Sequence, residues 1–320
     1  MLKLYSYQIG KTALSLLTPG ACGQVLAGFS RAAYLVTEQA ELFWLTSENA
    51  PMHLRGMQIS GPFPQLAAGE KFFNDGRCIR IAPDFQLDFG DAYTWAVPVI
   101  PAETALPIEK IPVRVKSLFL DSFDFSQARG FGRLIPKIFS RAASQPDGET
   151  ESDPVLALAW PGIDKIAQAC LLRDMPRLLQ AANALVGLGE GLTPSGDDFL
   201  GGLLFCINTM QRLYPDFIYL DSSAQSLFIA SAGKRTHLIS FTQLKDCANG
   251  QAVEPLHEWI HSILSDQPPD STRPASCLTQ IGHSTGWDLL AGALTGLLLT
   301  FRKHDTIDSP AVAPKQEIYA

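Results

Sequence analysis

Two adjacent carboxylates, Asp197 and Asp198, stand in the least ordinary stretch of the sequence, GLGEGLTPSGDDFLGG at residues 187–202. Carboxylates can take a proton, accept a hydrogen bond from a substrate amide or bind a metal ion. The glycines expose backbone N–H groups before an apolar run, and a helix N-terminus of this kind attracts anions. We therefore predict an anion-binding turn with Asp197 and Asp198 as catalytic side chains, and the sequence leaves a metal ion undecided. The binding residues predicted in this turn are Gly189, Gly191, Thr193, Ser195 and Gly196.

Two well-known phosphate loops do not fit this turn. The dinucleotide-binding pattern G-x-G-x-x-G follows a strand, whereas the segment before Gly187 has helical periodicity and the glycine spacing differs. The spacing from Gly191 to Gly196 matches a P-loop, but aspartates stand where that loop requires Lys and then Ser or Thr. The turn is therefore not a nucleotide-hydrolase loop.

A second stretch of the chain repeats the motif. Residues 285–292, TGWDLLAG, align without gaps with residues 195–202, SGDDFLGG. Both copies place a hydroxyl, a glycine and an aspartate before an apolar run, so each is predicted to begin a helix. We predict that residues 189–198 and 283–288 line the same pocket. The second copy supplies the predicted binding residues His283, Ser284, Thr285, Gly286 and Asp288.

A simpler interpretation of both copies is helix capping. Ser-x-x-Asp and Thr-x-x-Asp are capping boxes, in which the hydroxyl and the acid satisfy free backbone N–H groups. Gly202 and Gly292 would then serve only to let two buried helices approach closely. This interpretation places Asp198 in a structural role and leaves Asp197 without one.

The segment between the copies, GKRTHLIS at residues 233–240, adds further candidates. Thr236 and Ser240 are four residues apart and share one face of a helix. The cations Lys234 and Arg235 either neutralise an anion or lie on the solvated surface. Histidines without metal-ligand spacing are more often structural, and no zinc pattern is present. The predicted wall of the pocket is Thr236, His237 and Ser240.

Composition limits the class of protein. The chain has 320 residues, 46% of them hydrophobic, and a net charge of −7, which argues against a nucleic-acid-binding protein. Its six cysteines form no C-x-x-C pair and lie mostly in apolar runs, as buried free thiols do. The start of the chain is not typical of a signal peptide, and the most apolar run, residues 289–301, is short for a membrane span. We expect a cytoplasmic protein with no membrane or nucleic-acid partner.

The order of elements predicts an α+β protein. Residues 1–140 form a β-rich, barrel- or sandwich-like domain, with strand candidates within 36–48, 78–81, 85–89 and 112–120. Residues 141–154 form a linker, residues 155–302 an α-helical domain with the Gly-rich site, and residues 303–320 a flexible tail. Helices are expected at 162–173, from 176, and at 199–213, 222–232, 236–248, 254–265 and 287–301, with a Pro-rich break before the last.

The motif 187–202, the Thr236–Ser240 segment and GHSTGWDLLAG together resemble the bacterial AllH-type family of oxamate carbamoyltransferase subunits. The resemblance implies a subunit of a multi-protein transferase that interconverts oxalurate and phosphate with oxamate and carbamoyl phosphate. It implies a small anionic substrate (phosphate, carbamoyl phosphate or a carboxylate) and other transferase subunits as partners. The alternative is a non-catalytic subunit that binds a metabolite or assists assembly.

Overall fold

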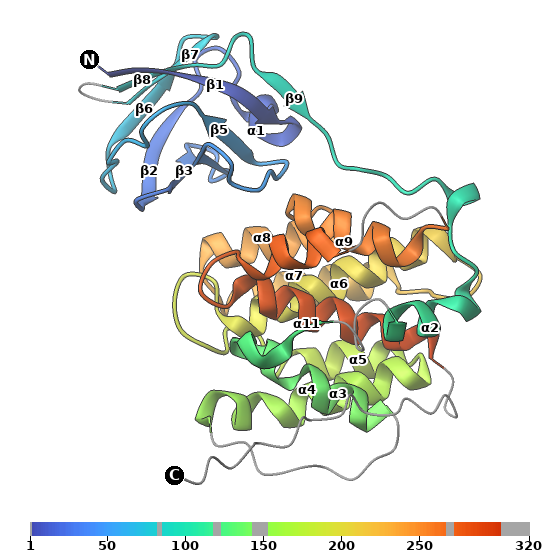
Figure 1. Ribbon diagram of the computed structural model, residues 1–320. Coiled ribbons are helices and arrows are strands. Elements are labelled where there is room, and N and C mark those ends of the chain that lie inside the picture. Colours follow the sequence, from blue (N-terminus) through green and yellow to red (C-terminus); the bar gives the residue numbers. More distant parts are fainter. Residues whose placement is uncertain (1, 82–84, 118–122, 143–152, 267–271, 302–320) are drawn as a thin grey trace, which may run out of the picture. The chain divides into compact units, whose positions relative to one another are not determined.

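The structure is a computed structural model that describes residues 2–81, 85–117, 123–142, 153–266 and 272–301. The chain divides into two compact units (Figure 1). The barrel unit consists of residues 1–99 with 251–258, and the helical unit consists of residues 100–250 with 259–320. The inclusion of residues 251–258 in the barrel unit was not predicted from the sequence.

Among the described residues, nine strands of the barrel unit form one sheet in the order β5-β4-β3-β2-β6-β7-β8-β1-β9. Antiparallel pairing of β5 with β1 closes strands β1 to β8 into a barrel, and β9 is an extra strand parallel to β1. The predicted barrel- or sandwich-like domain is therefore a closed barrel. Its strands are β1 Leu2–Gly10, β2 Cys22–Gly28, β3 Ala32–Thr37, β4 Leu42–Ser47, β5 Gly56–Ile59, β6 Lys71–Asn74, β7 Cys78–Ile81, β8 Phe85–Asp88 and β9 Tyr93–Trp95.

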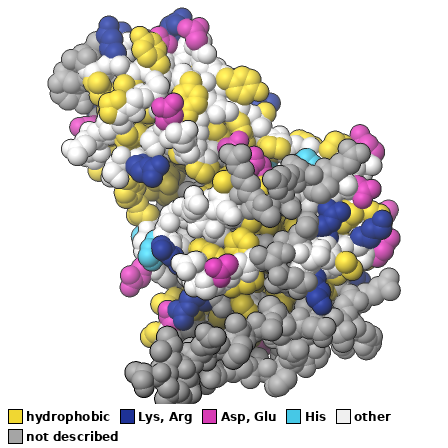
Figure 2. Space-filling view, in the orientation of Figure 1, with side chains coloured by type: hydrophobic (Ala, Val, Ile, Leu, Met, Phe, Trp, Pro, Cys, Tyr) yellow, Lys and Arg dark blue, Asp and Glu magenta, His cyan; other side chains and the backbone are white. Residues whose placement is uncertain are grey.

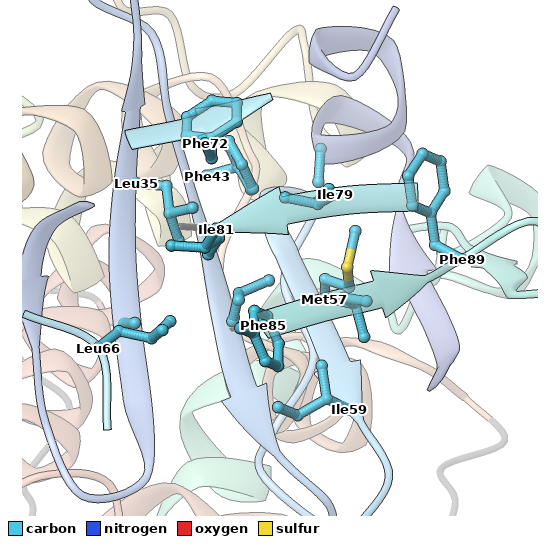
Figure 3. Close-up of a cluster of buried hydrophobic side chains, with 14 of the residues drawn as sticks. Leu35, Phe43, Met57, Ile59, Leu66, Phe72, Ile79, Ile81, Phe85 and Phe89 are labelled. Carbon is cyan, nitrogen blue, oxygen red and sulfur yellow. The ribbon is translucent and has the colours of Figure 1, made fainter. Parts of the chain in front are cut away.

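Alternating apolar residues produce the core of the barrel. Ile79 and Ile81 of β7 and Phe85 of β8 are buried, while Arg80 between the isoleucines is exposed. Figure 3 shows side chains from several strands packed together in this core. Apolar side chains also lie on the surface of this unit (Figure 2). Because single exposed apolar side chains are ordinary on protein surfaces, we assign no site to them.

Residues 251–258 are held to the barrel by the first turn of α9 (Glu254–Leu264). The Glu254 N–H donates to the Met52 carbonyl at 2.8 Å, and the Met52 N–H donates to Glu254 Oε2 at 3.1 Å. The Ala252 N–H donates to His257 Nε2 at 3.0 Å, which fixes that nitrogen as an acceptor. The barrel unit also contains the short helix α1 (Lys11–Leu16), which was not predicted.

The helical unit contains most of the predicted helices. Asp174 caps α5 and Pro176 lies in its first turn, as predicted. The expected strand at residues 112–120 is wrong where the chain is described, because residues 111–115 form α2 with Pro112 in the first turn, where its missing N–H costs nothing. The helices are α2 Ile111–Val115, α3 Ile135–Ala142, α4 Pro154–Leu172, α5 Met175–Ala182, α6 Ser195–Leu213, α7 Ser222–Ala232, α8 Leu238–Ala248, α9, α10 Thr272–Thr279 and α11 Thr285–Leu297.

The remaining predictions about this region have mixed outcomes. α10 covers the end of the expected Pro-rich break, where Pro274 falls in the first turn of that helix, and residues 267–271 of the break lie outside the described residues. α4 begins at Pro154 instead of residue 162, and Asp153 caps it by accepting from the Val155 N–H at 2.9 Å. The predicted tail and most of the predicted linker (residues 143–152) lie outside the described residues.

α4 is long and apolar enough, by length and composition alone, to cross a membrane. Its 19 residues have a mean hydropathy of 1.4, and 44% of this window is buried in the structure. The core helix of a folded domain passes the same test, so the property is weak evidence for a span. Cys170 of this helix is buried as a free thiol, as are Cys206 and Cys247 elsewhere in the unit.

The centre of the helical unit is the contact between α6 and α11. A Cβ added at Gly202 of α6 would lie 1.9 Å from the Leu289 carbonyl oxygen. A Cβ added at Gly292 of α11 would lie 1.8 Å from the Phe199 carbonyl oxygen. The two glycines hold equivalent places in the two motif copies, and each allows the backbone of the other helix to approach. The close helix approach suggested by the sequence is therefore confirmed.

Candidate functional site

The N-terminal turns of α6 and α11 meet at their hydroxyl side chains. The Oγ1 atoms of Thr193 and Thr285 lie 3.4 Å apart, and the Oγ atoms of Ser195 and Ser284 also lie 3.4 Å apart. These pairs join segments that are 92 and 89 residues apart in sequence. The convergence of the two motif copies, predicted from their alignment, is therefore present. Binding of a ligand between them remains a prediction.

Glycines shape the turn before α6. Gly187, Gly189 and Gly191 have φ angles of +74°, +119° and +89°, a region that side chains with a Cβ rarely adopt. Gly189 is also confined, because a Cβ there would lie 2.8 Å from the Ser195 nitrogen. Gly191 is exposed and has open space around it. The conformation of the turn therefore requires glycine at all three positions.

The capping-box interpretation is wrong for both copies. Ser195 is already the first helical residue of α6, and the N-cap is Pro194, which has no side-chain donor or acceptor. The N-cap of α11 is Ser284, and its side chain makes no capping hydrogen bond. Backbone carbonyls serve instead, since the N–H groups of Asp198 and Asp288 donate to Pro194 and Ser284. The two carboxyl groups are therefore not used as caps.

Asp197 is buried and fully engaged in a structural network. Its Oδ1 accepts the Gly187 N–H at 2.8 Å. Its Oδ2 accepts the Ser240 hydroxyl at 2.7 Å and the Thr236 hydroxyl. These bonds tie the glycine turn to the start of α8, and a carboxylate with three donors has little left to offer a ligand. The contacts of Asp197 thus favour a positioning role over the catalytic role predicted from the sequence.

Asp198 and Asp288 differ from Asp197 in having an unused oxygen. Their side chains are 5% and 0% exposed. Within the described part of the chain, Oδ2 of each has no hydrogen-bond partner. A buried acceptor without a partner costs free energy, so such atoms are rare in native proteins unless a ligand, an ion or a proton satisfies them. This pair is the clearest chemical feature of the two turns.

The surroundings of Asp198 disfavour its charged form. Burial raises the pKa of Asp198 well above its usual range, and the neighbouring charge of Asp288 raises it further. Hydroxyls of Thr285 and Thr193 act in the opposite direction by hydrogen bonding to the carboxyl group. Thr285 belongs to the other motif copy, so each half of the site acts on the other.

Asp288 shows the same crosswise arrangement. Burial raises its pKa to about 7. The Phe131 N–H, which donates to Asp288 Oδ1 at 2.6 Å, opposes this rise, as do the hydroxyls of Ser195 and Ser284. The raised pKa values favour the protonated form of both acids near neutral pH. One can then donate a proton, and the other can accept one when it is ionised.

A comparison with protein families finds a match for this part of the chain. Residues 185–297 match the family model described as oxamate carbamoyltransferase subunit AllH. Because residues 185–297 are similar to this family, we call them the AllH-type segment. It contains both motif copies, the Thr236–Ser240 segment and the acid pair, so the resemblance inferred from these residues is confirmed. No solved structure matches the chain.

A segment outside the AllH-type match completes the surroundings of Asp288. Besides the Phe131 N–H, the turn η5 (Gly130–Leu134) brings Gly130 against this carboxyl group. Gly130 has φ +50°, and a Cβ there would lie 2.3 Å from Asp288 Oδ1 and 2.8 Å from Ser284 Cβ. Sequence reasoning missed this contribution. Its signal is the pair of glycines in Arg129-Gly-Phe-Gly-Arg133, which has no counterpart in the motif copies.

The other predicted site residues separate into two groups. Gly196 and Gly286 are buried where backbones meet, since a Cβ would lie 2.0 Å from the Leu185 oxygen and 1.8 Å from the Leu278 oxygen. His237 and His283 are exposed, and in the described chain neither imidazole hydrogen bonds to the aspartates of the AllH-type segment. The structure therefore gives no support to a role for the histidines.

Neither a metal site nor a surface hollow changes this picture. No group of three or more His, Cys, Asp or Glu side chains suited to a metal ion occurs among the described residues. A surface hollow of about 440 Å³ lies in the barrel unit, lined by residues that include Cys22, Glu38 and Lys71. None of the predicted site residues lines it. The acid pair between α6 and α11 remains the candidate site.

Proposed function

We propose that the protein is a subunit of an oxamate carbamoyltransferase-like enzyme, and that Asp198 and Asp288 carry out proton transfer in it. The family match supports the transferase subunit, because the matched family is described in those words. The observation that carries the site is the unpartnered Oδ2 on each of the two buried carboxyl groups. Other subunits of the transferase are its proposed partners, and the cytoplasm is its proposed compartment.

The proposed reaction needs one proton donor and one proton acceptor. A phosphate oxygen forms a bond to the carbamoyl carbon of oxalurate, and the bond from that carbon to the inner nitrogen breaks. The electron pair stays on the nitrogen, which takes a proton and leaves as the amide of oxamate. The phosphate hydroxyl loses a proton, so one proton moves overall and the charges balance. A protonated carboxyl group can supply the first proton, and its ionised neighbour can take the second.

The environment of the pair suits these roles. A carboxyl group with its pKa near 7 is present in both forms at neutral pH, which is the condition for efficient acid–base catalysis. The N-termini of α6 and α11 add partial positive charge where an anion would lie. Asp197, Thr236 and Ser240 would hold the glycine turn in place, and the hydroxyls of Thr193 and Thr285 would orient the substrate.

Reconstitution tests the proposed function directly. The purified chain, its companion subunits and the complete mixture would each be assayed for carbamoyl phosphate formed from oxalurate and phosphate. We expect activity only in the complete mixture, and its loss when this chain carries Asp198→Asn. Full activity of the companion subunits alone would contradict the proposal, and full activity of the complete mixture with Asp198→Asn would favour an assembly role for this chain.

A further inference from the structure

The proposed site holds two carboxyl groups and several hydroxyls, and among the described residues no hydrogen bond or ion pair joins a cationic side chain to Asp198 or Asp288. Phosphate and oxamate are anions, and the pair carries a negative charge whenever one carboxyl group is ionised. The partial charges of two helix N-termini offset only part of this repulsion. If the proposed function is right, the site therefore requires a cation that the motif copies themselves do not contain.

Three of the arginines and lysines near these elements can be compared by their contacts. Arg235 already donates to the Asn183 carbonyl oxygen at 2.9 Å and to Asn183 Oδ1 at 3.1 Å. Arg133 pairs with Asp153 at 3.1 Å. Lys234 is exposed at the end of α7, and no bond in the described chain holds its ammonium group. Neither arginine is free to bind a ligand without losing an existing contact.

Arg129 is exposed like Lys234, but it differs from Lys234 in adjoining a residue that is packed against Asp288. It precedes Gly130, whose backbone is pressed against Asp288 Oδ1 and Ser284 Cβ, and consecutive Cα atoms are about 3.8 Å apart. Its side chain is exposed, and no ion pair or hydrogen bond in the described residues engages the guanidinium group. The tight packing of Gly130 and the Phe131–Asp288 bond fix the backbone that carries Arg129.

We infer that Arg129 is an anion-binding residue of the proposed site and that it contacts the phosphate or carboxylate of the ligand. This inference rests on the proposed function. The guanidinium group is suited to the role because it offers two parallel N–H donors to a phosphate or carboxylate. The fixed turn delivers this cation beside the acid pair from outside the AllH-type segment, which explains why the motif copies contain none.

Binding of inorganic phosphate and of oxamate to the full chain tests the inference, measured by titration calorimetry at pH 7. We expect Arg129→Gln to raise the Kd of at least one of these anions by about tenfold or more, since a hydrogen bond to a charged group has roughly this effect. The Kd of Arg129→Lys should lie between those of the wild type and Arg129→Gln, because lysine retains the charge and loses the paired donors. Arg133→Gln is the matched control, an exposed arginine four residues further along, and should leave Kd within about twofold.

The outcomes separate this inference from the proposed function. Wild-type binding that Arg129→Gln leaves unchanged would overturn the assignment of Arg129 and leave the acid pair intact. An equal loss of anion affinity in Arg129→Gln and Arg133→Gln would also overturn the assignment, because the effect would then come from general surface charge. A wild-type chain that binds neither anion would overturn both this inference and the anion-binding part of the proposed function.

Discussion

The hydroxyl oxygens of Thr193 and Thr285 lie 3.4 Å apart at the starts of two helices that carry the same motif. This contact places the aspartates of both copies, Asp198 and Asp288, in one buried environment in which each has an unpartnered oxygen. The internal repeat therefore builds one site from two similar halves.

The raised pKa of Asp288 makes the stability of the protein depend on pH. The folded protein retains a proton up to about pH 7, whereas the unfolded chain loses it near pH 4. The free energy of unfolding should therefore fall as pH rises from about 4 through 7, by on the order of 4 kcal/mol at most. Asp288→Asn should remove the part of this fall that Asp288 causes and leave the part that Asp198 causes, measured by urea unfolding at pH 5 and pH 8. Asp221→Asn, at an exposed helix cap, should leave the whole fall in place, and an unchanged slope in Asp288→Asn would refute the assignment.

Substitution of Asp197 should lower the free energy of unfolding, whereas substitution of Asp198 should leave it unchanged or raise it. Asp197→Ala leaves the Gly187 N–H and the Ser240 hydroxyl without their acceptor, so it should cost roughly 3–5 kcal/mol of unfolding free energy. Asp198→Asn replaces a buried carboxyl group whose charged form is disfavoured by burial and by Asp288, and should be neutral or stabilising at pH 8. Denaturant unfolding of both variants decides the matter. Equal destabilisation would mean that both carboxylates are structural.

The contact between α6 and α11 offers a sharp comparison of two neighbouring glycines. Gly202→Ala would put a Cβ 1.9 Å from the Leu289 carbonyl oxygen, and the helices would have to separate. A Cβ at Gly201 would lie 3.4 Å from Cys247 Sγ, an ordinary contact distance. We expect Gly202→Ala to cost about 1–3 kcal/mol or more, and Gly201→Ala to be nearly neutral, in thermal unfolding. Similar melting temperatures for the two variants would contradict the close helix contact.

Gly130 should be needed for the site as well as for the fold. A Cβ there would collide with Asp288 Oδ1, in addition to the strain caused by its positive φ. Gly20 has φ +88° with nothing within 4 Å, so Gly20→Ala reports the backbone strain alone, about 1–2 kcal/mol. Gly130→Ala should lose more stability than this and should lower carbamoyl transfer in the reconstituted enzyme. Activity equal to that of Gly20→Ala would show that the η5 turn does not shape the site.

The sequence predicted the features that a repeated motif encodes. It did not predict the roles that depend on contacts between residues far apart in the chain. The alignment of Ser195 with Thr285 predicted the convergence because identical small residues, Gly202 and Gly292, are needed on both sides of one helix contact. The roles of Asp197 and Asp198 could not be separated, since they depend on which carboxyl group meets Thr236 and Ser240 from a distant helix. Residues 251–258 carry no pattern that links them to the barrel.

The contribution of η5 was also beyond the sequence. Gly130 and Phe131 lie 157 or more residues from Asp288 and outside both motif copies, so no spacing or repeat connects them. Only the packed structure shows that the Phe131 N–H serves the carboxyl group. The barrel was predictable to a greater extent, because alternating residues such as Phe85 and Leu87 both mark a strand and fill its core.

The rate of carbamoyl phosphate formation by the reconstituted enzyme with Asp288→Asn in this chain tests the central claim most directly. Asn keeps the shape of the side chain but cannot exchange a proton at neutral pH, while substrate binding by the two turns should survive. The account predicts that kcat falls by about a hundredfold or more, with little change in KM and with loss of the pH dependence near 7. A variant with the kcat and pH profile of the wild type would contradict it.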